Sequence, residues 1–274
     1  MGPVKPRIRS PLLAIGINGV DLNLRDKVIL VAGSSRGIGK EVAGFLLDEG
    51  ARVCISGRDA AALEAAKIEL SPRGQLLAFS GDLSEPSGVS DVIEFIRSKW
   101  DTLDALVANL GTGRGTAGWD QTEDEWDRLF TLNFHASRRL ANAVIPALAS
   151  NGGGSIVFIS SITGVEATPA PLPYSAAKAA LINYSKNLSR LVAAQKIRVN
   201  CIAPGNIIFP GGSWDNRLAT SPELVARMLK AEVPMERLGT PDEIASLVAF
   251  LCSERASFIT GSCVIADGGQ TRRL

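Results

Sequence analysis

The sequence predicts an α/β protein with a doubly wound parallel sheet of about seven strands and helices on both faces. Short apolar runs rich in β-branched residues alternate with longer amphipathic segments, which is the order of strands and helical crossovers in such a sheet. A glycine-rich turn joins the first run to the first amphipathic segment. With 274 residues and 46% hydrophobic content, the chain can bury one large core but is short for two enzyme domains.

We expect a single domain over residues 21–274 and a flexible N-terminal leader over residues 1–20. The leader contains three Pro, three basic residues and no acidic residue, and regular apolar spacing begins only near Leu22. A transit peptide is the alternative for this segment. The predicted strands are the short apolar runs Lys27–Ala32, Arg52–Ser56, Gln75–Phe79, Ala105–Ala108, Ser155–Ser160, Arg198–Ala203 and Cys263–Ala266.

Two helix starts and one long loop are predicted in the second half of the chain. Thr122 and Thr240 each precede a Glu by three residues, at Glu125 and Glu243, which is the pattern of a reciprocal helix cap. The segment Gly205–Ser221 is rich in Gly, Pro and Trp, so we expect it to be a loop and a candidate lid.

The composition argues against several classes of partner. Lys plus Arg (29) nearly equals Asp plus Glu (28), and no segment concentrates basic residues, so we expect no nucleic acid partner. No apolar run reaches the length of about 18 residues that a membrane span needs. The four cysteines lie in separate apolar segments without a CxxC pair, which indicates buried, reduced thiols, no metal site and a cytoplasmic protein.

The turn Gly33–Gly39 follows the first strand directly and precedes the helical pattern Lys40–Glu49. Its glycines allow backbone angles closed to other residues and let a pyrophosphate approach the main chain, while the next helix offers free N–H groups to the anion. Glu41 stands where a P-loop needs Ser or Thr. We interpret the turn as a dinucleotide site, with a tight turn before a buried helix as the alternative. The expected cofactor contacts here are Gly33, Ser35, Arg36, Gly37, Ile38 and Gly39.

The second strand ends in Ser56-Gly57-Arg58, without the carboxylate that holds the ribose hydroxyl of NAD. Arg58 and Arg36 can instead reach a 2′-phosphate, which favours NADP(H) over NAD(H). Two solvated surface arginines are the alternative.

Tyr174 and Lys178 are four residues apart in an Ala-rich helical segment, so they lie on one helical face. A free phenol titrates near pH 10, and a nearby ammonium has the right sign to lower that pKa for acid/base work. Ser161 follows the strand Ser155–Ser160, at the carboxyl end where ligands bind in open α/β sheets. It is therefore a candidate to bind the same substrate oxygen.

Together, the glycine turn, Ser161, Tyr174 and Lys178 resemble the short-chain dehydrogenase/reductase family, whose catalytic signature is this Ser followed by Tyr-x-x-x-Lys. The resemblance runs from about Leu22 to Gly269 and implies a Rossmann-type fold. Further motifs match in family order: Asp82-Leu83, Asn109 and Gly111 in Ala108-Asn109-Leu110-Gly111, Asn133 in a helix, Pro204-Gly205, and the closing stretch from Arg237 to Gly269.

The resemblance implies a role for each of these residues. Tyr174 is the general acid/base, Ser161 holds the carbonyl oxygen, and Lys178 binds the nicotinamide ribose and lowers the pKa of Tyr174. Asn133 seats a water of the proton relay, and no metal is required. The further cofactor contacts are Asp82, Leu83, Asn109, Gly111, Tyr174, Lys178, Pro204, Gly205 and Ile207. Phe209 departs from the family, which commonly has a Thr there against the nicotinamide carboxamide, so that contact is open.

We therefore predict an NADP(H)-dependent oxidoreductase that transfers hydride between the cofactor and a ketone or secondary alcohol, with 3-oxoacyl compounds among the candidates. The segments Thr112–Trp119, Ile162–Leu172 and Asn206–Arg227 are mostly small or apolar and predict a neutral substrate of modest size. The resemblance implies a homotetramer, or a homodimer. Two alternatives are open: an NAD-dependent secondary alcohol dehydrogenase and a non-catalytic dinucleotide-binding sensor.

Overall fold

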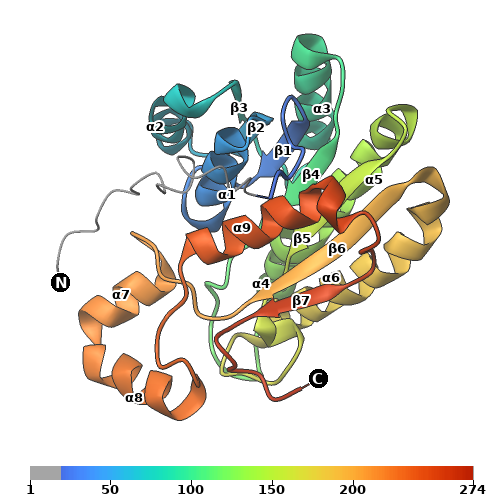
Figure 1. Ribbon diagram of the computed structural model, residues 1–274. Coiled ribbons are helices and arrows are strands. Elements are labelled where there is room, and N and C mark those ends of the chain that lie inside the picture. Colours follow the sequence, from blue (N-terminus) through green and yellow to red (C-terminus); the bar gives the residue numbers. More distant parts are fainter. Residues whose placement is uncertain (1–19, 274) are drawn as a thin grey trace.

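Seven strands form one parallel sheet in residues 20–273, the part of the chain that the computed structural model describes (Figure 1). The strand order is β3-β2-β1-β4-β5-β6-β7, so the winding changes direction between β1 and β4. The doubly wound α/β prediction is confirmed, and the leader predicted for residues 1–20 lies, apart from residue 20, outside the described residues. The strands are β1 (Val28–Ala32), β2 (Arg52–Gly57), β3 (Leu76–Ser80), β4 (Ala105–Ala108), β5 (Gly154–Ile159), β6 (Ile197–Pro204) and β7 (Cys263–Ala266).

Helices cover both faces of the sheet, so the central strands are apolar along their whole length. α1, α2 and α9 lie over one face, and α3, α5 and α6 lie over the other (Figure 1). The helices are α1 (Gly37–Asp48), α2 (Ala60–Leu70), α3 (Pro86–Trp100), α4 (Glu123–Phe130), α5 (Ala136–Ser150), α6 (Leu172–Val192), α7 (Ser213–Thr220), α8 (Pro222–Glu232) and α9 (Pro241–Cys252).

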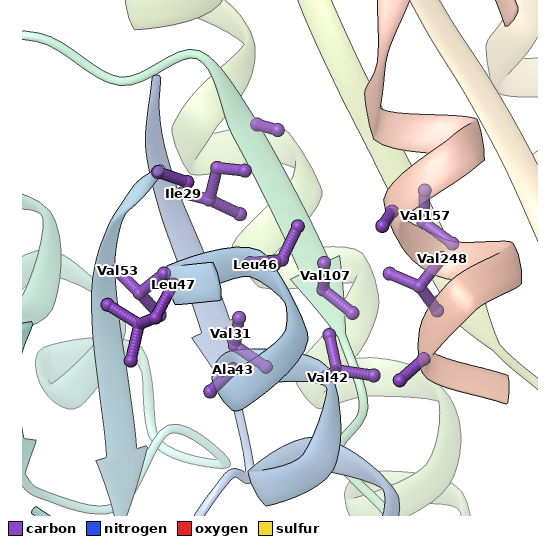
Figure 2. Packing of buried hydrophobic residues seen from close by; sticks show 14 of the residues in the cluster. Ile29, Val31, Val42, Ala43, Leu46, Leu47, Val53, Val107, Val157 and Val248 are labelled. Carbon is purple, nitrogen blue, oxygen red and sulfur yellow. The ribbon is translucent and has the colours of Figure 1, made fainter. Parts of the chain in front are cut away.

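Alternate residues of each strand enter the two cores. Ile29 and Val31 of β1 pack with Val42 and Leu46 of α1 and with Val248 of α9, as Figure 2 shows. The intervening β1 residues enter the opposite core with α3, α5 and α6. All five residues of β1 are buried, which explains why the run Val28–Ala32 reads as continuously apolar.

The two predicted helix caps differ in the structure. Thr240 and Glu243 form the full reciprocal cap of α9, with the Thr240 N–H donating to Glu243 Oε2 at 2.9 Å. Thr122 caps α4 by accepting from the Glu125 N–H at 3.3 Å, but the Glu125 carboxylate binds Arg128 instead of returning to Thr122. The pattern therefore identified both helix starts and one of the two reciprocal caps.

The predicted loop Gly205–Ser221 is partly wrong, because α7 occupies Ser213–Thr220 within it. Asp215 in the first turn accepts a hydrogen bond from the Gly211 N–H and ties the start of the helix to the preceding glycines.

The prediction that all four cysteines are buried is only partly correct. All four thiols are free, Cys54 and Cys201 are buried, but Cys252 and Cys263 are only half-buried. Within residues 20–273, no helix is both long and apolar enough to cross a bilayer.

Candidate active site

The glycine turn after β1 has the backbone that the sequence requires. Gly33 and Gly37 have φ angles of +71° and +57°, in the region that favours glycine. A Cβ at Gly39 would overlap the Gly33 carbonyl oxygen, so helix and strand can approach closely only without a side chain there. α1 begins with no side-chain cap and no acidic residue in its first turn, which leaves its N–H groups and its positive end open to an anion.

A cleft of about 330 Å³ lies over this turn, at the carboxyl ends of β1 to β4. Its size, its glycine backbone and the open end of α1 fit a dinucleotide phosphate group. Most residues predicted to contact the cofactor line this cleft: Gly33, Ser35, Arg36, Ile38, Arg58, Asp82, Leu83, Asn109 and Gly111.

Several other residues predicted to contact the cofactor do not line the cleft. Gly37 and Gly39 shape the turn without lining the cleft, and Gly205 and Ile207 line neighbouring cavities. Pro204 lines neither the cleft nor these neighbouring cavities, because it ends β6 and pairs with Ala266. The sequence reasoning missed several lining residues, all of them next to motifs it had found: Ser56, Gly57, Ser84, Leu110, Thr112, Leu132 and Ala136. For Ser84, Leu110 and Thr112, the position after a strand end was the signal available, whereas Leu132 and Ala136 lie in helical turns near Asn133.

Arg58 and Arg36 both line the cleft, but only Arg36 is unengaged among the described residues. Arg58 lies 3.4 Å from a carboxylate oxygen of Asp82. Burial alone would raise the pKa of Asp82, but hydrogen bonds from Ser84 and the Arg58 charge outweigh it, so the pKa of this carboxyl is lowered. The acidic group near the cleft is therefore ionised and already matched by a cation.

A second cavity, of about 850 Å³, contains the hydroxyls of Ser161 and Tyr174. Ser161 follows β5 and Tyr174 lies in the first turn of α6, and their side chains are hydrogen-bonded to each other. Gly113, Phe209 and Ser213 line both this cavity and the cleft, so the two spaces adjoin.

Two contacts hold the Ser161 turn against α6. The Ser160 hydroxyl donates to the Lys178 carbonyl at 2.9 Å. A Cβ at Gly164 would lie 2.6 Å from the Ala179 nitrogen, so only glycine lets the turn pack this closely on the helix. The spacing of Ser161 from Tyr174 thus depends on Gly164, which the sequence reasoning missed.

Lys178 is 4% exposed, and its Nζ donates to the Ile159 carbonyl at 2.9 Å. Burial lowers the pKa of Lys178 to about 8, partly opposed by the neighbouring Cys201. The same Nζ lies 5.9 Å from the centre of the Tyr174 ring.

The pKa of Tyr174 differs from the sequence expectation. We expected the Lys178 ammonium to lower it, but in the chain alone burial raises the pKa of Tyr174, and the Ser161 hydrogen bond opposes this only in part. The reason is that Lys178 is itself desolvated and directed at the end of β5.

Asn133 lies in a π-helical turn, Thr131–His135, between α4 and α5. Its Oδ1 accepts from the Thr112 N–H at 3.0 Å, and its Nδ2 donates to the Thr112 and Leu129 carbonyls. A Cβ at Gly111 would lie 2.5 Å from Asn133 Oδ1 and 3.1 Å from Lys178 Nζ, so the absence of a side chain at residue 111 leaves room for both polar groups beside it. The structure thus brings Asn133, Ser161, Tyr174 and Lys178 to one end of the sheet.

Phe209, which replaces the family Thr, lies where the cleft and the second cavity adjoin. A Cβ at Gly37 would lie 2.7 Å from its ring, so the aromatic side chain rests on the glycine turn. Tyr184, the other tyrosine of the chain, lies elsewhere on α6, where its hydroxyl donates to Asn142 Oδ1 at 2.8 Å and its ring packs on Phe134 and Phe158.

The parallel sheet, the glycine turn and the adjoining cavities define a Rossmann-type α/β protein with a Ser-Tyr pair at its second cavity. Comparison with known proteins makes the class specific. The profile of the enoyl-(acyl carrier protein) reductase family matches residues 32–271. The chain belongs to the short-chain dehydrogenase/reductase family of oxidoreductases.

Relatives of several activities share this sequence and fold. The chain is 36% identical over 248 residues to the 3-oxoacyl-acyl-carrier-protein reductase FabG of Escherichia coli (strain K12), covering 90% of this chain and 98% of that protein. It is 34% identical to dehydrogenase/reductase SDR family member 4 of Rattus norvegicus, covering 92% and 89%. L-sorbose reductase from Gluconobacter frateurii, solved with NADPH and L-sorbose, superposes with a TM-score of 0.87 at 32% identity, covering 93% of this chain and all of that one.

Proposed function

We propose that this protein is an NADP(H)-dependent oxidoreductase that interconverts a ketone and a secondary alcohol, with Tyr174 as general acid/base. The observation that carries the proposal is the junction of the two cavities at Gly113, Phe209 and Ser213. A carbonyl group held by Ser161 and Tyr174 lies beside the opening to the cleft.

The nicotinamide ring supplies or accepts the hydride when the cofactor is bound. Ser161 and Tyr174 present two hydroxyls to one substrate oxygen, and Tyr174 transfers its proton to that oxygen as negative charge develops there. The raised pKa of Tyr174 favours the protonated phenol, which is the form that reduction requires. Lys178 binds the ribose hydroxyls of the cofactor, and Asn133 supports it through Gly111.

The arginines of the cleft support NADP(H) as the cofactor. Arg36 and Arg58 offer two cations to a 2′-phosphate, and the nearby Asp82 is already paired with Arg58. Relatives do not decide this point, because L-sorbose reductase was solved with NADPH and a 7α-hydroxysteroid dehydrogenase, at TM-score 0.85 and 30% identity, was solved with NADH.

The homotetramer and the cytoplasmic location belong to the same proposal, and light scattering in solution tests the assembly.

The experiment is a panel of ketones and aldehydes assayed for loss of reduced-cofactor absorbance with NADPH and with NADH. We expect turnover, with a higher kcat/KM for NADPH. A higher value for NADH would support the NAD-dependent dehydrogenase. Binding of NADPH without turnover of any carbonyl compound would support the dinucleotide-binding sensor.

A further inference from the structure

The second cavity, which we call the substrate cavity, is closed on one side by two short helices that carry cations. α7 contributes Trp214 and Arg217, and α8 contributes Arg227. Both helices project from the sheet beyond the carboxyl ends of its strands, at the lower left of Figure 1.

The two carboxylates of the substrate cavity, Glu166 and Glu232, both contact Arg272. Glu166 accepts a hydrogen bond from the Arg272 N–H at 2.9 Å. The Arg272 guanidinium lies 3.9 Å from the carboxylate of Glu232. The segment before the C-terminus therefore engages the negative charge of this cavity.

The two cations from α7 and α8 have no carboxylate partner among residues 20–273. The Arg217 guanidinium lies 4.9 Å from the centre of the Trp214 ring. Stacking of this kind orients a guanidinium while leaving the N–H donors at its edge free. Arg227 makes no ion pair within the described residues, although Glu223 is one helical turn away on the same helix.

We propose that the substrate carries an oxyanion, a carboxylate or a phosphate, at a distance from its carbonyl group, and that Arg217 and Arg227 bind this oxyanion. Arginine side chains bind both anions through paired N–H donors. The proposal rests on the proposed function, because Ser161 and Tyr174 hold the other end of the same molecule. A charged substrate of this kind differs from the neutral substrate that the composition of the lining segments predicted.

The test compares matched charged and neutral compounds with NADPH as cofactor. One pair is acetoacetate and methyl acetoacetate, and the other is acetoacetyl-4′-phosphopantetheine and acetoacetyl-pantetheine. The proteins are the wild type, the double variant Arg217→Gln/Arg227→Gln and the control Arg97→Gln. Arg97 is an exposed arginine of α3 that lines neither the cleft nor the substrate cavity. Calorimetric titration of NADP-loaded protein with 3-hydroxybutyrate and its methyl ester gives a readout that does not need turnover.

We expect kcat/KM for the charged member of at least one pair to be about tenfold higher, through KM rather than kcat. The double variant loses this preference and the control keeps it, and the pair that responds distinguishes a carboxylate from a phosphate. Equal values within both pairs, or a preference that survives in the double variant, overturn the proposal and leave the proposed function intact. Tighter, arginine-dependent binding of 3-hydroxybutyrate without reduction of any compound sinks the proposed function and leaves the anion site standing.

Discussion

The cofactor cleft and the substrate cavity adjoin, but the chain builds them in different ways. The cleft is lined mainly by the ends of β1 to β4 and the turns that follow them, so the parallel sheet fixes its position. The substrate cavity is lined mainly by segments outside the sheet: residues 162–171, α7, α8 and residues 270–271. The sheet therefore fixes the position of the proposed cofactor cleft, whereas the connections after β5 and β6 shape the proposed substrate cavity.

Lys178 is buried next to Tyr174 and is proposed to bind the cofactor ribose, so replacing it gives the largest effect of the five variants considered next. We expect Lys178→Met to lower kcat by about a thousandfold, within the usual range for loss of acid/base machinery. Steady-state kinetics at saturating cofactor measures the effect.

The same variant also tests the burial of the ammonium. Because the pKa of Lys178 falls from 10.5 to about 8 on folding, the unfolded chain binds more protons between these values, and the wild type gains stability as pH rises through that window. Lys178→Met loses this gain in stability with pH, and we expect it to be at least as stable as the wild type at pH 7. Urea unfolding at pH 7 and at the alkaline end of the window measures both free energies of unfolding. Severe destabilisation at pH 7 would show that the lysine serves the fold.

Gly164→Ala tests the division into two regions, because the Ser161 turn that it displaces lines the substrate cavity and not the cleft. The added Cβ pushes the Ser161 turn away from α6, and a shift of about 1 Å is enough to lower kcat by about a hundredfold. The Kd for NADPH stays within about twofold, because the cleft is built elsewhere. Equal loss of kcat and of cofactor binding would contradict the division into two regions.

Arg36→Gln acts on the cleft alone. Arg36 lacks a partner within the described residues, so its loss lowers the preference for NADPH over NADH by about tenfold. Arg58→Gln has a smaller effect, since Arg58 is shared with Asp82. The ratio of kcat/KM values for the two cofactors checks both, with Arg97→Gln as the control. A larger effect at Arg58 would reverse this assignment.

Glu243→Gln lies outside both regions and gives the smallest effect. The hydrogen bond from Arg237 and the Thr240 N–H lower the pKa of Glu243 to about 2. Its stabilising contribution is therefore full above about pH 4.5 and is lost as pH falls toward 2. We expect the variant to lower Tm by about 1–2 °C at neutral pH and to leave kcat unchanged. Scanning calorimetry at neutral and acidic pH checks the first point, and a changed kcat would contradict the second.

The sheet could be predicted from sequence because each strand leaves its own local signal. Ala105–Ala108 and Cys263–Ala266 match β4 and β7 to the residue, and the other strands differ by one residue at one or both ends. Strands buried on both faces need apolar residues throughout, and the turns that follow them need glycine or small polar residues.

The substrate side could not be predicted in the same way, because its features depend on contacts between distant segments. Arg217 and Arg227 are ordinary helix residues in the sequence, and only the fold shows that both line one cavity whose carboxylates contact Arg272. Gly164 is one of 27 glycines, and its role depends on α6 crossing the turn. The raised pKa of Tyr174 reflects desolvation in the folded chain, which no spacing reveals.

The most direct test of the central claim compares the two tyrosines of the chain. Tyr174 faces the substrate cavity, whereas Tyr184 packs against Phe134 and Phe158 and binds Asn142. We predict that Tyr174→Phe lowers kcat by about a thousandfold with unchanged Kd for NADPH, while Tyr184→Phe stays within about twofold of the wild type. Retention of a substantial part of kcat by Tyr174→Phe would contradict the claim that this phenol exchanges the proton with the substrate.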